Sequence, residues 1–232
     1  MSDPAVTIAR GPAAGGGEIV LRTRPGAGPG GTEGYELIVN GVFAMDTVQV
    51  SSELALASET LARLSGRDWH VVVGGLGLGY TLRELLADRR VTSVEVVELE
   101  PALVGWVRAG LVGPAAAVLD DPRVRVCVGD VVEHLARLPP ESADAVLLDV
   151  DNGPDFLLHQ ANSSLYDVPA LRSALRALRP GGRLSVWSAE PSADLVSRLH
   201  AIGTEVEAVR LPVRREGRSF EYVLYLAGIM DA

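Results

Sequence analysis

The chain has 232 residues, of which 47% are hydrophobic and 22% are charged, a balance typical of a globular domain. Its 30 acidic residues outnumber the 21 basic ones and give a net charge of -9. This charge argues against a general binder of nucleic acid or of anionic membranes, because both attract basic surfaces. Lysine is absent, which excludes Schiff-base chemistry and the usual P-loop.

The single cysteine, Cys127, cannot form an internal disulfide, and the N-terminus lacks a signal-peptide pattern. No apolar run approaches the ~20 residues that a membrane-spanning helix needs. We therefore expect a cytoplasmic protein that partners neither membranes nor nucleic acid.

Residues 1–50 predict a small N-terminal β-hairpin subdomain. Residues 11–34 are rich in glycine and proline and predict flexible loops around one short strand at 18–22. Further on, an Asn40-Gly41 pair separates two apolar runs, which is the pattern of a hairpin with a type I′ turn.

Residues 51–232 predict a second, larger domain in which apolar runs alternate with helical segments. The expected strands are 69–73, 93–98, 123–128, 143–148 and 183–187. The expected helices are about 80–88, 101–110, 130–138, 168–178 and 191–202. Alternation of this kind implies βαβ units and a parallel sheet.

The C-terminal tail differs, because the segments 205–211 and 220–226 flank a charged loop and predict an antiparallel hairpin. The expected fold is therefore α/β and Rossmann-like. It combines a mostly parallel seven-stranded sheet, helices on both faces and the C-terminal hairpin, as in class I S-adenosylmethionine-dependent methyltransferases.

A glycine-rich loop between an expected strand and an expected helix is the best candidate for a cofactor site. Gly75, Gly77 and Gly79 alternate with other residues, a spacing that suits a nucleoside-methionine loop. A dinucleotide loop would need glycine where Tyr80 stands. Leu76 lies within the loop, and the alternative interpretation is a purely structural turn.

Two acidic residues at the ends of the following strands are candidate nucleoside ligands. Glu98 can accept the hydroxyls of a ribose, whereas Glu100 can simply favour the start of a helix. Asp130, with the backbone N–H of Val131, can recognise an adenine amino edge. The alternative for Asp130 is a helix N-cap.

A loop rich in aspartate follows the fourth expected strand, where open α/β sheets bind ligands. Asp149 and Asp151 are candidate catalytic residues there, although such loops are also ordinary turns. His159 is a candidate base and Tyr166 a candidate wall of the acceptor pocket; packed, structural roles are the alternatives.

Two residues that follow the N-terminal hairpin, Asp46 and Gln49, are candidates for the acceptor side of the site. A metal site has little support, because the four histidines are scattered without ligand spacing. Cys127 lies within an apolar run, so covalent catalysis is not expected either.

The chain resembles the spermidine synthase family of aminopropyltransferases, and the resemblance covers most of its length. The motifs that carry it are Asn40-Gly41-Val42-Phe43, Gly74-Gly75-Leu76-Gly77-Leu78-Gly79-Tyr80-Thr81-Leu82-Arg83-Glu84, Val96-Val97-Glu98-Leu99-Glu100-Pro101, Asp121-Pro122-Arg123-Val124-Arg125-Val126, Gly129-Asp130, Leu148-Asp149 to Pro154, and Leu178-Arg179-Pro180-Gly181-Gly182. The resemblance implies a methyltransferase-like fold, a small N-terminal β domain, an adenosyl sulfonium donor and often a homodimer.

The resemblance also implies roles for individual residues. It assigns ribose binding to Glu98 and adenine binding to Asp130, places Leu99 against the adenine, and places Asp149 near the sulfonium. Three departures stand out. Leu76 replaces an Asp that holds the amine of decarboxylated S-adenosylmethionine. Asn152 takes the place of the family's catalytic base, with Asp151 one residue early, and Ala44 replaces a polar residue.

These departures favour methyl transfer from intact S-adenosylmethionine to a small-molecule acceptor, since an apolar Leu76 leaves an ammonium unpaired. Asp149, Asp151 or His159 would then act as base, and Asn152 would contact the acceptor. Two alternatives are an aminopropyltransferase that uses the decarboxylated donor and a non-catalytic adenosyl-binding homologue.

Overall fold

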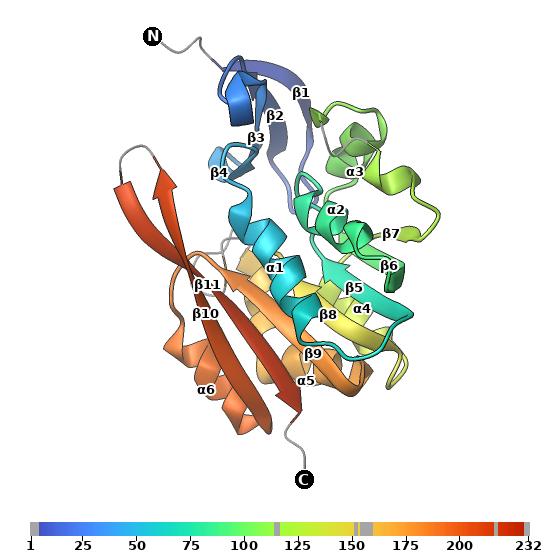
Figure 1. The fold of residues 1–232 in the computed structure, drawn as a ribbon. Helices are drawn as coiled ribbons and strands as arrows, with labels where there is room; N and C mark the ends of the chain where they lie inside the picture. The colour runs from blue at the N-terminus through green and yellow to red at the C-terminus, as the bar shows by residue number, and fades with distance from the viewer. Residues whose placement is uncertain (1–4, 114–116, 151–152, 154–159, 216–217, 230–232) are drawn as a thin grey trace.

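The structure is a computed structural model that describes residues 5–113, 117–150, 153, 160–215 and 218–229 (Figure 1). It contains two β-sheets, one of four strands near the N-terminus and one of seven strands that forms the body of the molecule. The division at residue 50 into two domains stays a prediction.

The N-terminal sheet is antiparallel, with strand order β1-β2-β3-β4. Its strands are β1 (Val6–Pro12), β2 (Glu18–Arg24), β3 (Gly34–Val39) and β4 (Val42–Asp46). Asn40 and Gly41 have φ angles of 52° and 77°, the pair of positive values that a type I′ turn needs. The sequence analysis missed β1, whose edge position leaves its residues largely exposed and removes the apolar signal of a buried strand.

The seven-stranded sheet has the order β10-β11-β9-β8-β5-β6-β7. Its strands are β5 (Trp69–Gly74), β6 (Val91–Glu98), β7 (Val124–Val128), β8 (Ala143–Leu148), β9 (Leu178–Ser188), β10 (Thr204–Arg215) and β11 (Arg218–Ile229). The pairs from β9 to β7 are parallel, whereas β11 pairs antiparallel with β9 and β10. The expected mostly parallel sheet with a C-terminal antiparallel hairpin is therefore confirmed.

Helices cover both faces of this sheet (Figure 1). They are α1 (Ser51–Ala62), α2 (Tyr80–Ala87), α3 (Pro101–Arg108), α4 (Val131–Arg137), α5 (Val168–Ala177) and α6 (Ala193–Ala201). Short 3-10 segments are η1 (Pro29–Gly31), η3 (Val118–Asp120) and η4 (Gln160–Tyr166). Val71 and Val73 pack into one core with α1, α2 and α3, and Val72 packs into the other with α4, α5 and α6, as strand alternation requires.

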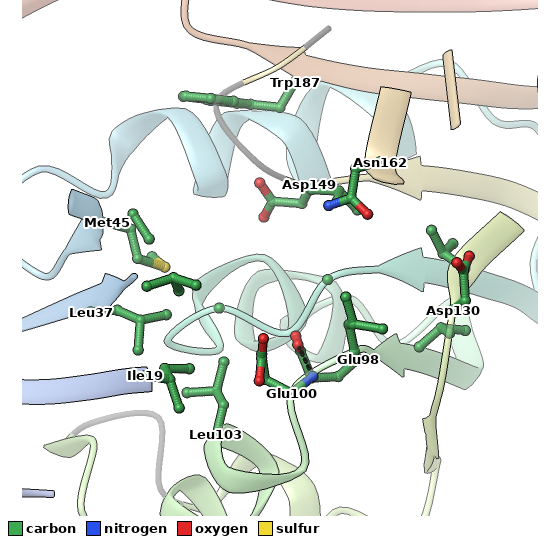
Figure 2. Close-up of a pocket in the computed structure, with 18 of the residues that line it drawn as sticks. Ile19, Leu37, Met45, Glu98, Glu100, Leu103, Asp130, Asp149, Asn162 and Trp187 are labelled. Carbon is green, nitrogen blue, oxygen red and sulfur yellow. Dashed lines mark hydrogen bonds between the residues drawn. The ribbon is translucent and has the colours of Figure 1, made fainter. Parts of the chain in front are cut away.

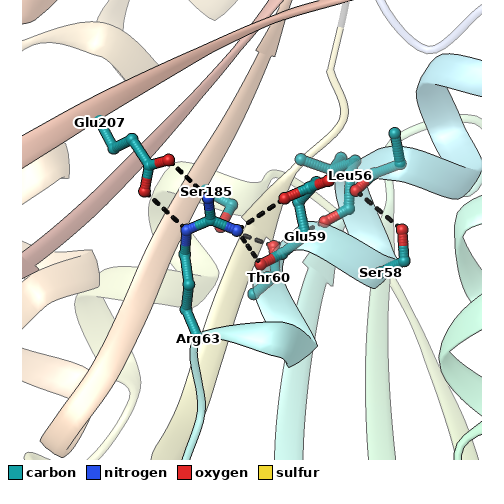
Figure 3. Close-up of polar contacts among 8 residues, drawn as sticks. Leu56, Ser58, Glu59, Thr60, Arg63, Ser185 and Glu207 are labelled. Atoms are coloured by element: carbon teal, nitrogen blue, oxygen red, sulfur yellow. Dashed lines mark hydrogen bonds and ion pairs between the residues drawn. The ribbon is translucent and has the colours of Figure 1, made fainter.

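Polar contacts fix α1, which the sequence analysis did not predict, onto the large sheet (Figure 3). The hydroxyls of Thr60 and Ser185 of β9 are buried and lie 2.7 Å apart. One residue beyond α1, Arg63 donates two hydrogen bonds of 2.7 and 2.6 Å to the carboxylate of Glu207 in β10. A third donor of Arg63 lies 2.7 Å from the carboxylate of Glu59. The contacts of Thr60 with Ser185 and of Arg63 with Glu207 hold α1 in one position over β9 and β10.

Among the described residues, no helix is both long and apolar enough to cross a membrane.

The Thr60–Ser185 pair gives a stability prediction. T60V leaves the Ser185 hydroxyl buried without its partner, so we expect the free energy of unfolding to fall by about 1–3 kcal/mol. The double variant T60V/S185A should lose less than the sum of the two single variants, because it removes both polar groups. Urea unfolding measures these values, with S58A on the exposed side of α1 as a near-neutral control. Additive losses in the double variant would contradict the pairing.

Candidate active site

A pocket opens where the parallel strands of the large sheet end (Figure 2). Together with its open mouth it encloses about 950 Å³. Its lining residues are Ile19, Leu37, Val39, Ala44, Met45, Glu53, Gly75, Gly77, Val97, Glu98, Leu99, Glu100, Leu103, Gly129, Asp130, Val131, Asp149, Val150, Asn162 and Trp187. The N-terminal sheet supplies much of one apolar wall, and the carboxyl ends of β6, β7 and β8 supply most of the polar groups.

The glycine loop after β5 allows close packing that a side chain would prevent. Gly75 has a φ of 93°, and a Cβ there would overlap the backbone oxygen of Asp149. A Cβ on Gly77 would lie 2.7 Å from Sδ of Met45 in β4. Gly79 has a φ of 82° and is the residue before α2, but it does not line the pocket. The loop therefore packs against β8 on one side and against the N-terminal sheet on the other.

Glu98 ends β6 and is buried, with its carboxylate at the pocket. The backbone N–H of Leu76 donates to Oε2 at 2.7 Å, and that of Glu100 donates to Oε1 at 2.8 Å. Burial raises the pKa of Glu98, and the two N–H donors oppose that shift. Each carboxylate oxygen keeps a second lone pair, so hydroxyl groups of a ligand can still donate to it.

Three of the expected adenine contacts, Leu99, Asp130 and Val131, line the same pocket. Oδ1 of Asp130 accepts a hydrogen bond of 2.6 Å from the N–H of Val132, so Asp130 also serves as the N-cap of α4. The two interpretations of Asp130 are compatible, because its second oxygen remains available. Glu100 does not cap α3 with its side chain; its Oε2 instead accepts from the N–H of Ala14 at 2.9 Å.

Another acidic residue, Glu53 of α1, lines the pocket together with Asp149. Burial and the charge of Asp149 raise the pKa of Glu53 to about 7. Burial also raises the pKa of Asp149, whose Oδ2 accepts a hydrogen bond of 2.6 Å from the hydroxyl of Thr81. The pocket therefore holds two carboxyl groups whose ionised forms are stabilised by a bound cation. Glu53 was not predicted as a site residue, because α1 itself was not predicted.

Trp187 of β9 also closes the pocket, on the side of Asp149 (Figure 2). Its ring packs 4.8 Å from that of Tyr222 in β11. Its buried Nε1 makes no hydrogen bond with the described residues and remains a donor for a ligand. Trp187 lies in no catalytic motif, so the sequence pattern did not indicate it as a site residue.

Several expected site residues lie elsewhere in the structure. The side chain of Leu76 is buried in the core and does not line the pocket, although its backbone binds Glu98. Asp46 is buried, and its Oδ1 accepts from the N–H groups of Val48 and Gln49, which makes a turn after β4. The side chain of Gln49 donates to the hydroxyl of Ser51.

Tyr166 is buried in the core, and its hydroxyl donates to the carbonyl of Val150 at 2.9 Å. The contact fixes Tyr166 against Val150, and Tyr166 does not line the pocket described above. Three further candidates, Asp151, Asn152 and His159, lie outside the described residues, and their roles stay predictions.

Comparison with known proteins identifies the family. The spermine/spermidine synthase domain matches residues 55–206, more than half of the chain. The chain belongs to the spermine/spermidine synthase family. The resemblance inferred from the sequence motifs is thereby confirmed.

Relatives within this family differ in how much of their length the chain spans. The chain is 36% identical to the polyamine aminopropyltransferase of Mycobacterium tuberculosis over 123 residues, which cover 52% of the chain and 23% of that protein. It is 32% identical to polyamine aminopropyltransferase 2 of Pseudomonas aeruginosa over 172 residues, which cover 69% of the chain and 46% of that protein. The chain thus spans about a quarter to a half of the length of these curated relatives.

Solved structures support the fold. A spermidine synthase in complex with the transition state analogue AdoDATO matches with a TM-score of 0.76 and 19% identity, over 97% of this chain and 75% of that one. The spermidine synthase from Thermotoga maritima matches with a TM-score of 0.75 and 18% identity, over 97% of this chain and 74% of that one. At 18–19% identity, these two matches are evidence for the fold alone.

The expectation that this protein is a methyltransferase is wrong. Family membership and the named relatives point to aminopropyltransferases and spermidine synthases instead. The expectation rested on the apolar Leu76, taken as a missing partner for an ammonium. The structure buries Leu76 in the core and puts Glu53 and Asp149 in the pocket, so acidic groups for a cationic ligand are present at other positions.

Two glycine substitutions, one in the glycine loop and one in α3, form a matched pair. G75A places a Cβ against the backbone of Asp149 at a positive φ, so we expect a loss of at least about 2 kcal/mol in the free energy of unfolding. G105A in α3 meets no atom within 4 Å and should stabilise the protein by about 0.5–1 kcal/mol. Denaturant unfolding of both variants checks this, and a neutral G75A would contradict the loop geometry.

Glu53 gives a prediction on pH dependence. Its folded pKa of about 7 lies above the ordinary value of 4.5, so between these pH values the unfolded chain is ionised while the folded protein keeps the proton. Stability contributed by Glu53 therefore falls as pH rises from 4.5 to about 7. E53Q removes this penalty and should be about 1–3 kcal/mol more stable than the wild type at pH 8.

Denaturant unfolding from pH 4.5 to 8 measures this difference for E53Q and for E18Q, which changes an exposed carboxylate on β2. We expect the difference between E53Q and the wild type to grow across this range. Parallel stability curves for E53Q and the wild type would show that Glu53 is not held protonated by its surroundings.

Proposed function

We propose that this protein transfers an aminopropyl group from decarboxylated S-adenosylmethionine to a small amine of the polyamine class. The observation that carries the proposal is the pair of partly buried carboxyl groups, Glu53 and Asp149, in a pocket of a member of the spermine/spermidine synthase family. No metal enters this proposal.

The adenosine part of the donor fits the other end of the pocket. Glu98 offers its carboxylate to the ribose hydroxyls, and Asp130 with the N–H of Val131 offers contacts for the adenine edge. Leu99 and Val97 supply apolar surface on the same side. These assignments follow from the positions of the residues at the carboxyl ends of β6 and β7.

The charge of the pocket favours the decarboxylated donor. That donor carries an ammonium and a sulfonium, both positive, and ionised Glu53 and Asp149 attract them. Intact S-adenosylmethionine carries in addition a carboxylate, which these groups repel in a pocket shielded from water. This argument replaces the one based on Leu76.

The transfer needs little beyond alignment and a proton acceptor. The lone pair of the acceptor amine attacks the carbon next to the sulfonium, and the C–S bond breaks with both electrons going to sulfur. The new C–N bond leaves a proton on nitrogen, and a carboxylate accepts it. Asp149 is our candidate for that group, since it lies at the end of β8 and the Thr81 hydroxyl fixes its orientation. Trp187 offers an aromatic surface to an ammonium at the same end.

The predictions of a homodimer and of a cytoplasmic location belong with this proposal. Both derive from the family resemblance and the composition, as described above. A role for Asp151 as an additional base and a role for Asn152 in acceptor binding likewise stay proposals.

The test is a product assay. The purified protein is incubated with decarboxylated S-adenosylmethionine and a diamine, and mass spectrometry measures the aminopropylated diamine and methylthioadenosine. We expect both products, with D149N slowing their formation about 10²–10⁴-fold, because a proton acceptor is lost. E18Q, on the exposed surface of β2, should retain the wild-type rate.

The outcomes separate the alternatives. Donor binding without any product would indicate the non-catalytic adenosyl-binding homologue. Wild-type turnover in D149N would remove Asp149 from the mechanism but leave the transfer reaction in place.

A further inference from the structure

A cluster of potential metal ligands lies under α4, outside the active-site pocket. It consists of Glu95 in β6, Cys127 in β7 and His134 in α4, one ligand atom from each. All three ligand atoms lie within 4.8 Å of one another. The proposed transfer reaction uses none of these residues.

The fold brings these residues together from distant parts of the chain. β6 and β7 are parallel neighbours in which Glu95 pairs with Arg125, and Val97 with Cys127. Glu95 and Cys127 therefore lie diagonally on the same face of the sheet. α4 covers that face and brings His134 onto them. Because Glu95 and Cys127 are 32 residues apart in sequence, no short sequence motif indicates the site.

Two of the three distances between the ligand atoms are close to those around a tetrahedral ion. Sγ of Cys127 lies 3.2 Å from Oε1 of Glu95, and Nε2 of His134 lies 3.1 Å from Oε2. Ligand bonds of about 2.0–2.3 Å place neighbouring ligands of a tetrahedral ion roughly 3.3–3.7 Å apart. Small side-chain movements are therefore enough to admit an ion between the three groups.

The ring nitrogen of His134 is a second sign of a ligand. Nε2 is fully buried, and it makes no well-directed hydrogen bond within the described part of the chain in spite of its 3.1 Å distance from Glu95. A buried nitrogen without a hydrogen bond is costly. A bound cation would use its lone pair and remove that cost.

We propose that Glu95, Cys127 and His134 bind a divalent ion of the zinc class. Thiolate sulfur and imidazole nitrogen select such ions over Mg²⁺ and Ca²⁺, which prefer oxygen ligands alone. The Cys127 thiol releases its proton on binding, so thiolate and carboxylate together balance the two positive charges of the ion. A water molecule would complete the fourth position of the ion.

Arg125 at present supplies the positive charge next to Glu95. Its Nε lies 3.6 Å from Oε1, and its side chain is 78% exposed, so it can turn into solvent when an ion binds. The arginine and the ion therefore compete for the same carboxylate, and removal of the arginine should favour the ion.

Titration of the metal-free protein with Co²⁺, a spectroscopic substitute for Zn²⁺, tests the proposal. We expect saturable binding of one equivalent, a thiolate-to-cobalt charge-transfer band in the near ultraviolet, and loss of that band when Zn²⁺ is added. Absence of the band in the wild type would overturn the proposal, whatever the variants do. The readout is independent of catalytic activity.

The variants assign the ligands. C127S should abolish the band, and H134N and E95Q should each weaken cobalt binding at least about 10-fold. H200N, which changes a histidine on α6, should bind as the wild type does. R125Q should bind cobalt more tightly than the wild type, and weaker binding would contradict the competition. Circular dichroism confirms that each variant is folded, and a band that persists in folded C127S would overturn the proposal.

Discussion

The structure of this protein depends on carboxyl groups that are wholly or partly buried around the carboxyl ends of the parallel strands. An ionised carboxylate is costly to bury unless donors or cations compensate it. Glu98 has two backbone N–H donors and Asp149 has the hydroxyl of Thr81. Glu53 has the hydroxyl of Ser52, yet its pKa is still raised to about 7. The unbound pocket thus contains electrostatic strain that a cationic ligand relieves.

That constraint explains why the N-terminal sheet and α1 belong to the site. Met45 of β4 packs on the glycine loop and accepts a hydrogen bond of 3.2 Å from the N–H of Leu78. α1 places Glu53 in the same pocket as Asp149 and is itself fixed to the sheet through Thr60 and Arg63. Apolar walls from both elements keep water away from the carboxyl groups and strengthen their interaction with a positive charge.

The sequence predicted the parts of the fold that follow from local periodicity. The apolar runs of the parallel strands, the Asn40-Gly41 turn and the C-terminal hairpin all lie where these patterns indicated. It did not predict β1, an exposed edge strand, or α1, whose buried face includes Ser52 and Thr60 along with leucines. Both lack a strong apolar signal.

The site shows the same limit of sequence reasoning. Residues at strand ends, such as Glu98 and Asp130, could be located from the βα pattern, because that pattern fixes where ligands bind. The positions of the other site residues depend on long-range packing. The side chain of Leu76 packs in the core, whereas Glu53 and Trp187 line the pocket. Long-range packing also assembles the proposed metal site, in which His134 lies one turn of α4 beyond Val131 of the pocket.

The most direct test of the account is a calorimetric comparison of two donors that differ by one carboxylate. Wild-type protein is titrated with decarboxylated S-adenosylmethionine and with intact S-adenosylmethionine at pH 8. The account predicts that the decarboxylated compound binds at least about 10-fold more tightly, which corresponds to ~1.4 kcal/mol, and that E53Q reduces this preference. Equal or tighter binding of intact S-adenosylmethionine would contradict it.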